Sequence, residues 1–140
     1  MAKIVIDANV IISAAFGGKP LEAVVRALED HEVYVSETID RELQGVVLGL
    51  SKKLSKDQIL FVREKIQQLL SLANHISIST HVVLSRDAKD DHYLSLCKEA
   101  KADFLITGDK DLLSISQGDL NEIGISCRMV TPLEFLENIP

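Results

Sequence analysis

Short apolar segments alternate with longer amphipathic ones along this chain, and this alternation limits the possible folds more than any other feature. The amphipathic segments repeat apolar side chains at helical spacing, whereas the short ones are rich in β-branched residues. Such an order predicts an α/β fold, a three-layer α/β/α sandwich with a doubly wound, mainly parallel, five-stranded sheet. The segments expected as strands are 3–7, 32–36, 75–79, 104–107 and 125–131.

Helices are expected where a capping residue or a proline precedes an apolar stripe. Pro20 and Pro132 each predict the start of a helix. Either Ser36 or Thr38 is expected to cap a helix after the second strand, and Ser55 to cap the next one. The connections between strands are therefore helical, as a parallel sheet requires.

Length and composition suit one cytoplasmic domain. The 140 residues, 46% of them hydrophobic, are enough for one domain over 1–140 with a substantial core. No stretch approaches the roughly 18 consecutive apolar residues of a membrane span, and the amino terminus lacks the layout of a signal peptide. We therefore expect no membrane contact. Cys97 and Cys127 lie in apolar surroundings and are expected to be buried thiols.

The formal net charge of −6 argues against a protein that holds nucleic acid through a large basic patch. A site that binds cations could hold part of this negative charge, and the net charge would then be compatible with a nucleic-acid substrate. Lys110 and the group Lys52, Lys53 and Lys56 are the candidate phosphate contacts, although exposed lysines usually serve solubility.

Two aspartates follow predicted strands. Asp7 ends the segment 3–7, and Asp109 comes just after the segment 104–107. The carboxyl ends of parallel strands meet at one edge of a sheet, which is where such sheets place their sites. These two side chains are therefore the first candidates for a functional site.

Two further acids can reach this edge from helices. Glu42 precedes Leu43 on the helix after the second strand, so it borders the buried face of that helix. Asp90 begins a helix expected over 90–101 and lies in line with its inward-facing side chains, Tyr93, Leu94 and Cys97. Asp91 is rotated by about 100° from Asp90, so we favour Asp90 and keep Asp91 in reserve.

Three polar residues near these acids are secondary candidates. Asn9 offers a neutral oxygen ligand, and Thr107 could position water or an acid, or satisfy backbone groups. Asp111 could support the site from outside it, but it is more typical of a helix N-cap. We expect these residues to assist the main acids rather than to replace them.

Each main acid also has a structural explanation. Asp7, Asp90 and Asp109 could each cap a turn or a helix, and Glu42 could be an ordinary surface acid. Four such coincidences at one edge of a sheet are much less common than any one of them. Their convergence favours a functional site.

Converging carboxylates repel one another, and a cation relieves that repulsion. Oxygen ligands suit Mg²⁺ or Mn²⁺, whereas the 4 histidines are too scattered in the sequence to indicate a zinc site. One or two such ions can align water against a phosphodiester and stabilise the leaving oxygen. The residues thus predict metal-assisted phosphodiester hydrolysis.

The segments that carry these acids together resemble a known family. VIDANV, TIDREL, RDAKDDHYLSLC, ADFLITGDKDLL and MVTPLEFL follow one another in the order typical of PIN-domain ribonucleases. The likeness is strongest to the VapC-like branch, the toxin components of toxin–antitoxin pairs, and it covers nearly the whole chain. Each motif is weak alone, whereas the ordered set is specific.

The resemblance implies a fold, an activity and partners. It implies the α/β/α sandwich, Mg²⁺ or Mn²⁺ dependence, cleavage of RNA, frequent formation of a homodimer, and a small antitoxin protein that blocks the site. Carried over residue by residue, it implies catalytic and metal-binding roles for Asp7, Glu42, Asp90 and Asp109. Cys97 stands where the family usually has alanine, which should not disturb the site.

Two other functions stay open at this point. The chain could be a catalytically dormant PIN-fold scaffold that only binds a partner. It could also be a phospho-acceptor receiver-like signalling domain, which would need an adjacent pair of acids near the first strand. The chain has only Asp7 there, so this second alternative rests on fold analogy alone.

Overall fold

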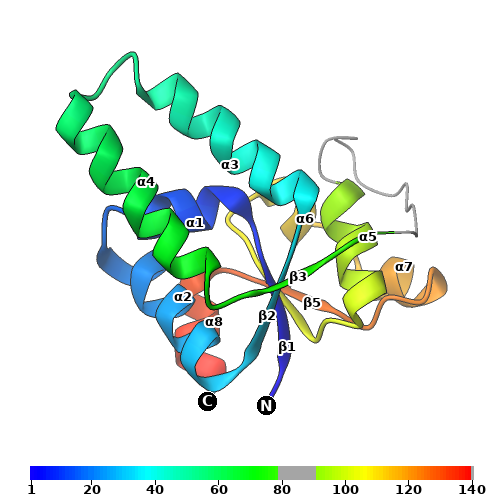
Figure 1. The fold of residues 1–140 in the computed structure, drawn as a ribbon. Coiled ribbons are helices and arrows are strands. Elements are labelled where there is room, and N and C mark those ends of the chain that lie inside the picture. Colours follow the sequence, from blue (N-terminus) through cyan, green and yellow to red (C-terminus); the bar gives the residue numbers. More distant parts are fainter. Residues whose placement is uncertain (79–90, 140) are drawn as a thin grey trace.

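A parallel sheet forms the centre of the fold (Figure 1). The structure is a computed structural model that describes residues 1–78 and 91–139. Within those residues the sheet has 5 strands in the order β3-β2-β1-β4-β5, and every neighbouring pair is parallel. The strands are β1 (Lys3–Ile6), β2 (Glu32–Ser36), β3 (Asn74–Ile76), β4 (Phe104–Ile106) and β5 (Arg128–Val130). The doubly wound α/β fold expected from the sequence is confirmed.

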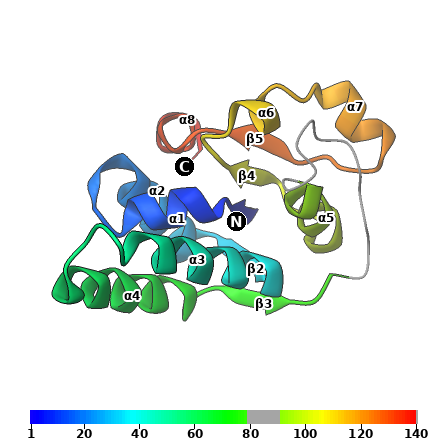
Figure 2. The ribbon, with the colours of Figure 1, turned by 90° about the horizontal axis from the view of Figure 1, so that it is seen from above.

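Helices cover both faces of the sheet, which completes the expected sandwich. Their bounds are α1 (Ala8–Ala14), α2 (Gly18–Asp30), α3 (Glu37–Leu50), α4 (Lys56–Leu70), α5 (Asp91–Ala100), α6 (Lys110–Leu113), α7 (Gln117–Glu122) and α8 (Pro132–Asn138). Seen from above in Figure 2, α1, α2, α3, α4 and α8 lie on one side of the strands, and α5 and α7 lie on the other. None of the helices in the described residues is long and apolar enough to cross a membrane.

Helix starts agree with the expected caps in three places. The Ser36 hydroxyl accepts the N–H of Ile39 at the start of α3, so Ser36 rather than Thr38 is the cap. Ser55 caps α4 through a reciprocal capping box with Gln58. Pro132 begins α8. These local signals could be recognised because a cap depends on residues only three positions apart.

Several boundaries differ from the sequence expectation. Asp7 caps α1 instead of ending β1 as a strand residue, and α1 itself was not anticipated. The third strand begins at Asn74, and the fifth is shorter than expected because its ladder starts only at Arg128. Asp109, not Asp111, caps α6, so the expected N-cap role of Asp111 is wrong.

The buried core runs through the central strands. Ile4, Val5, Leu105 and Ile106 are completely buried or nearly so, as expected for parallel strands covered on both faces. The two cysteines are free buried thiols, as the sequence indicated, with Cys127 Sγ donating to Cys97 Sγ at 3.6 Å. This contact and burial raise the pKa of the Cys97 thiol.

Replacing Leu105 with alanine tests the core. Leu105 is completely buried in β4, whereas Leu60 is 55% exposed on α4. We expect Leu105→Ala to lower the free energy of unfolding by about 2–5 kcal/mol, and Leu60→Ala to change it by less than about 0.5 kcal/mol. Urea unfolding followed by circular dichroism measures both. Equal losses in the two variants would contradict the packing described here.

Candidate functional site

Asp7 occupies the carboxyl end of the central strand with both carboxylate oxygens hydrogen-bonded. Oδ1 accepts the backbone N–H of Asn9 at 2.9 Å, which is the N-cap bond of α1. Oδ2 accepts the hydroxyl of Thr107 at 2.7 Å. Asp7 is only 3% exposed, so these donors hold its carboxylate in one orientation inside the protein.

Thr107 connects Asp7 to Asp109. Because Ile6 pairs with Ile106 in the sheet, the next residues, Asp7 and Thr107, leave the two strands side by side. The Thr107 hydroxyl donates to Asp7 and accepts the backbone N–H of Asp109 at 3.0 Å. Thr107 therefore serves both expected purposes, since it positions an acid and satisfies a backbone group.

Asp7 and Asp109 line one pocket, as expected from their places at the edge of the sheet. The pocket has a volume of about 430 Å³, and Asn9 and Gly108 also line it. Asp109 caps α6 through a hydrogen bond from the N–H of Asp111 to its Oδ1 at 2.8 Å. Asp111 thus stabilises the orientation of Asp109 through its backbone.

Glu42 joins this group through a tyrosine. The Tyr93 hydroxyl on α5 lies 2.6 Å from Glu42 Oε2 and 3.2 Å from Asp7 Oδ1. It also accepts the backbone N–H of Ala8 at 3.0 Å. Glu42 is therefore close to Asp7, although it does not line the same pocket.

Tyr93 keeps its phenolic proton. Burial raises its pKa well above the usual range, the negative charge of Asp7 raises it further, and so does the hydrogen bond to Glu42. The hydroxyl is thus a permanent donor between two carboxylates. A phenol has only one proton, so it can serve one carboxylate fully at a time.

His92 contacts the other oxygen of Glu42. Its Nε2 hydrogen-bonds Glu42 Oε1, and because a carboxylate can only accept, Nε2 is the donor. The ring also lies against Tyr93, with centroids 4.0 Å apart. In the sequence the 4 histidines are too scattered to indicate a zinc site, so this neighbour of Glu42 was missed.

The two aspartates at the start of α5 have different outcomes. Asp90 falls outside the described residues, so its expected role stays a prediction. Asp91 is the first residue of α5 and is only 8% exposed. Helical spacing predicts that Asp91 faces away from the inward side of the helix, yet Asp91 is buried. Asp91 is thus a stronger reserve candidate than the sequence indicated.

The donor set around the pocket suits a hard divalent cation. Asp7 and Asp109 offer carboxylate oxygens, and Asn9 offers a carboxamide oxygen. In the part of the chain that the structure describes, no Lys or Arg forms an ion pair with Asp7 or Asp109. A buried carboxylate without such a partner favours a bound cation.

The described residues alone do not form a complete group of metal ligands. No group of three or more His, Cys, Asp or Glu side chains that could hold an ion is found in residues 1–78 and 91–139. The expected set of four acids includes Asp90, which lies outside those residues. Asp7 and Asp109 are thus the described pair that fits a metal ion best.

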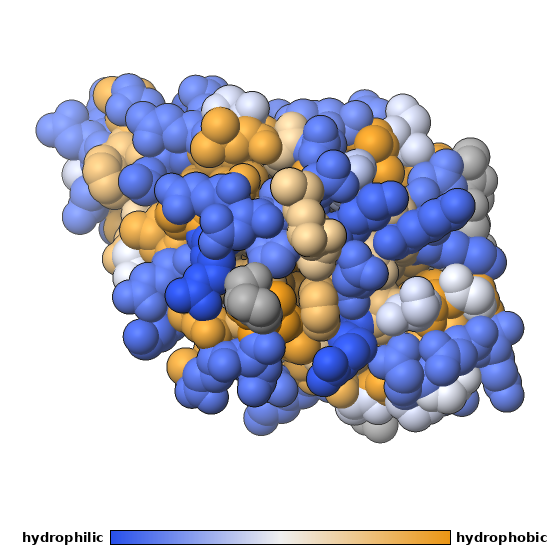
Figure 3. Space-filling model, turned by 90° about the horizontal axis from the view of Figure 1, so that it is seen from below, coloured by the Kyte–Doolittle hydropathy of each residue, from blue (hydrophilic) through white to orange (hydrophobic). Residues whose placement is uncertain are grey.

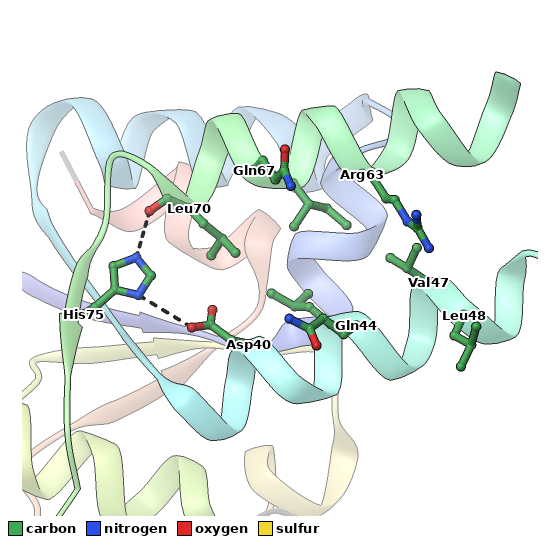
Figure 4. Close-up of a pocket in the computed structure, with 10 residues that line it drawn as sticks. Asp40, Gln44, Val47, Leu48, Arg63, Gln67, Leu70 and His75 are labelled. Carbon is green, nitrogen blue, oxygen red and sulfur yellow. Dashed lines mark hydrogen bonds and ion pairs between the residues drawn. The ribbon is translucent and has the colours of Figure 1, made fainter. Parts of the chain in front are cut away.

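A larger pocket lies between α3 and α4, away from these acids (Figure 4). It has a volume of about 630 Å³, with Val47 and Leu70 among its apolar residues. At one end His75 Nδ1 lies 3.6 Å from Asp40 Oδ2. Arg63 and Gln67 project from α4 along its rim. A single acid beside a histidine does not make a site for phosphate chemistry, so the smaller pocket is the better candidate.

The opposite edge of the sheet has a different character. A pocket of about 420 Å³ at the amino ends of the strands is lined by residues of both charges, including Asp103 and Arg128. Figure 3 shows this face, where hydrophilic residues surround small hydrophobic areas. The acids that converge lie at the carboxyl ends of the strands, as the rule for parallel sheets predicts.

Comparisons with known proteins support one family. A family model described as a PIN domain matches residues 3–111, well over half of the chain. Comparison with curated protein sequences found no match. The family match gives no support to the receiver-like alternative.

Two solved structures share the fold. The first is VapBC2 from Rickettsia felis bound to a DNA fragment from its promoter, with a TM-score of 0.58 and 14% identity over 92% of this chain and 98% of that chain. The second is a domain of a functionally unknown protein from Methanocaldococcus jannaschii, with a TM-score of 0.53 and 15% identity over 93% of this chain and 91% of that chain. At such low identity the likeness concerns the fold alone.

Thr107→Val tests the hydrogen bonds that join the two strand ends. Valine keeps the shape of threonine but leaves Asp7 Oδ2 and the Asp109 N–H without this partner. We expect a loss of about 1–3 kcal/mol in the free energy of unfolding. Thr107→Ser keeps the hydroxyl and should lose less. Urea unfolding of both variants checks this, and a valine variant as stable as the serine variant would contradict it.

Proposed function

This chain belongs to the PIN-domain family, and from that premise we propose that it is a Mg²⁺- or Mn²⁺-dependent endoribonuclease that hydrolyses RNA phosphodiester bonds. The observation that carries the proposal is the pocket lined by Asp7 and Asp109 at the carboxyl ends of β1 and β4. Glu42 lies next to this pair through the Tyr93 hydroxyl. Several acids from distant parts of the chain thus gather at one edge of the sheet.

We assign the acids as follows. Asp7, Asp109 and Asp90 are metal ligands, and Glu42 is a ligand either directly or through water. When bound, the divalent ion would lower the pKa of a water molecule and neutralise charge on the phosphodiester. Asn9 and Asp91 stay in reserve as additional oxygen donors.

Other residues of the chain hold the carboxylates of the site in a fixed orientation. Thr107 and the Asn9 N–H fix the Asp7 carboxylate, and the first turn of α6 fixes Asp109. The Glu42 side chain is 35% exposed, so water and substrate can reach it. Rigid placement of charged groups before substrate arrives is a main source of catalytic rate.

We also propose that this nuclease is the toxin of a toxin–antitoxin pair. The Rickettsia felis structure contains the VapBC2 proteins with promoter DNA, and the fold is shared. Cytoplasmic RNA would be the substrate, a small antitoxin would block the acidic pocket, and the active form would be a homodimer. The pairing would be supported by a neighbouring reading frame that encodes a small DNA-binding protein. That protein should copurify with this chain.

The dimer has its own test. Light scattering coupled to size exclusion should give twice the mass of the 15.4 kDa chain. A single peak at the mass of one chain over a wide concentration range would exclude the homodimer. It would leave the proposed chemistry intact, because the described acids come from one chain.

Asp7→Asn and Asp109→Asn test the metal ligands. Asparagine caps a helix as well as aspartate does, so both variants should fold, with an unchanged circular dichroism spectrum. RNA cleavage should fall by more than the roughly 10–100-fold typical of outer-shell changes. Isothermal titration calorimetry should show loss of Mn²⁺ binding, and a chelator should abolish cleavage by the unmodified protein.

Asp103→Asn is the matched control for these variants. Asp109 follows strand β4, whereas Asp103 precedes that strand. The Asp103 carboxylate accepts the N–H of Lys3 at 2.8 Å. An asparagine oxygen can accept the same hydrogen bond, so cleavage and Mn²⁺ binding should not change. If Asp7→Asn cleaves RNA as well as this control, the assigned roles are wrong. If the unmodified protein binds RNA but never cleaves it, the dormant scaffold is favoured.

A further inference from the structure

The Tyr93 side chain contacts two of the candidate acids from a third element. It lies on α5 and is 2% exposed. Asp7 follows β1 and Glu42 belongs to α3, so the hydroxyl joins two segments that are otherwise separate in the chain. A phenylalanine could fill the same space in the core. The hydroxyl therefore needs an explanation of its own.

The hydrogen bonds of the hydroxyl define its direction. The Ala8 N–H donates to the phenolic oxygen at 3.0 Å, so that oxygen is already used as an acceptor. The single proton can be donated to Glu42 Oε2 at 2.6 Å or to Asp7 Oδ1 at 3.2 Å, and the shorter distance favours Glu42. The 2.6 Å distance to Glu42 is typical of a hydroxyl that donates to a carboxylate. The hydroxyl thus fixes Glu42 and keeps Asp7 next to it.

Glu42 is held on both oxygens by consecutive residues of α5. His92 takes Oε1 and Tyr93 takes Oε2. The two donors therefore determine the orientation of the carboxylate plane as well as its position. Without these donors, a partly exposed glutamate on a helix would sample many rotamers, and that freedom would be lost on binding a cation.

We propose that Tyr93 is a positioning residue of the acidic site: its hydroxyl holds Glu42 beside Asp7, so that the two carboxylates are already spaced for a divalent cation before one binds. This inference rests on the proposed metal-dependent function, which it deepens by adding a residue outside the acids. Tyr93 contacts ligands rather than the reacting atoms. Its effect should therefore appear in cation affinity.

Tyr93→Phe is the direct test. It removes the hydroxyl and keeps the ring, so the packing of α5 is preserved. We expect the Mn²⁺ dissociation constant, measured by calorimetry on the metal-free protein, to rise about 10–100-fold, as for other partners of metal ligands. RNA cleavage at low Mn²⁺ should fall and should recover as Mn²⁺ is raised, because the ligands themselves remain.

The chain offers a matched control. It has 2 tyrosines, and the other one, Tyr34, directs its hydroxyl to Glu32 at 3.4 Å. Tyr34→Phe removes the same group from strand β2 and should leave Mn²⁺ affinity unchanged. A general effect of losing a phenol would appear in both variants, whereas a positioning role appears in Tyr93→Phe alone.

A spectroscopic measurement keeps the proposal testable if Tyr93→Phe does not fold. In the Tyr34→Phe background, labelling with 3-fluorotyrosine places one fluorine nucleus in the protein, beside the Tyr93 hydroxyl. Titration with Mg²⁺ should shift its ¹⁹F resonance as the neighbouring carboxylates bind the ion. A resonance that does not move at saturating Mg²⁺ would overturn the proposal.

The outcomes separate this inference from the proposed function. Unchanged Mn²⁺ affinity in Tyr93→Phe, with binding lost in Asp7→Asn, would overturn the role of Tyr93 and leave the metal site in place. Weakened affinity in Tyr93→Phe, in a protein that binds Mn²⁺ but does not cleave RNA, would support Tyr93 and count against the ribonuclease. No Mn²⁺ binding by the unmodified protein would overturn both.

Discussion

The hydrogen bond from Thr107 to Asp7 joins the carboxyl ends of β1 and β4, and the arrangement of the acidic site depends on it. Parallel pairing of the two strands sets the residues after them side by side. The same hydroxyl accepts the N–H of Asp109. The Thr107 side chain therefore orients Asp7 and also holds the backbone of Asp109 in place. The sheet thus determines the geometry of the pocket with little help from loops.

The sequence predicted the parts of the site that follow from sheet topology. The edge of the sheet, and Asp7 and Asp109 on it, could be expected because the carboxyl ends of parallel strands always share one edge. The residue at which β1 ends was harder to predict. Residues 8–14 continue the apolar, β-branched pattern of the strand, yet they form α1. Only the capping ability of Asp7 marks the change from strand to helix there.

The environment of Glu42 could not be predicted, since it depends on how α3 and α5 are placed in space. Helical spacing put Tyr93 on the inward face, but spacing does not tell which atoms its hydroxyl meets about 50 residues away. The 4 histidines are scattered in the sequence, and nothing in that pattern indicated that His92 contacts Glu42. Helical spacing predicted that Asp91 faces outward, but this rule holds only inside a helix. Asp91 is the first residue of α5, where neighbours outside the helix determine burial.

Asp7 is both a helix cap and a pocket residue, and this combination affects how the chain could evolve. Its carboxylate starts a helix and also faces the pocket, so drift at position 7 is constrained by folding even where selection for chemistry has ended. Asparagine and serine preserve a helix start, whereas alanine does not. A descendant without the proposed catalysis would therefore retain a polar capping residue there, and its pocket would keep the same outline after the charge had gone.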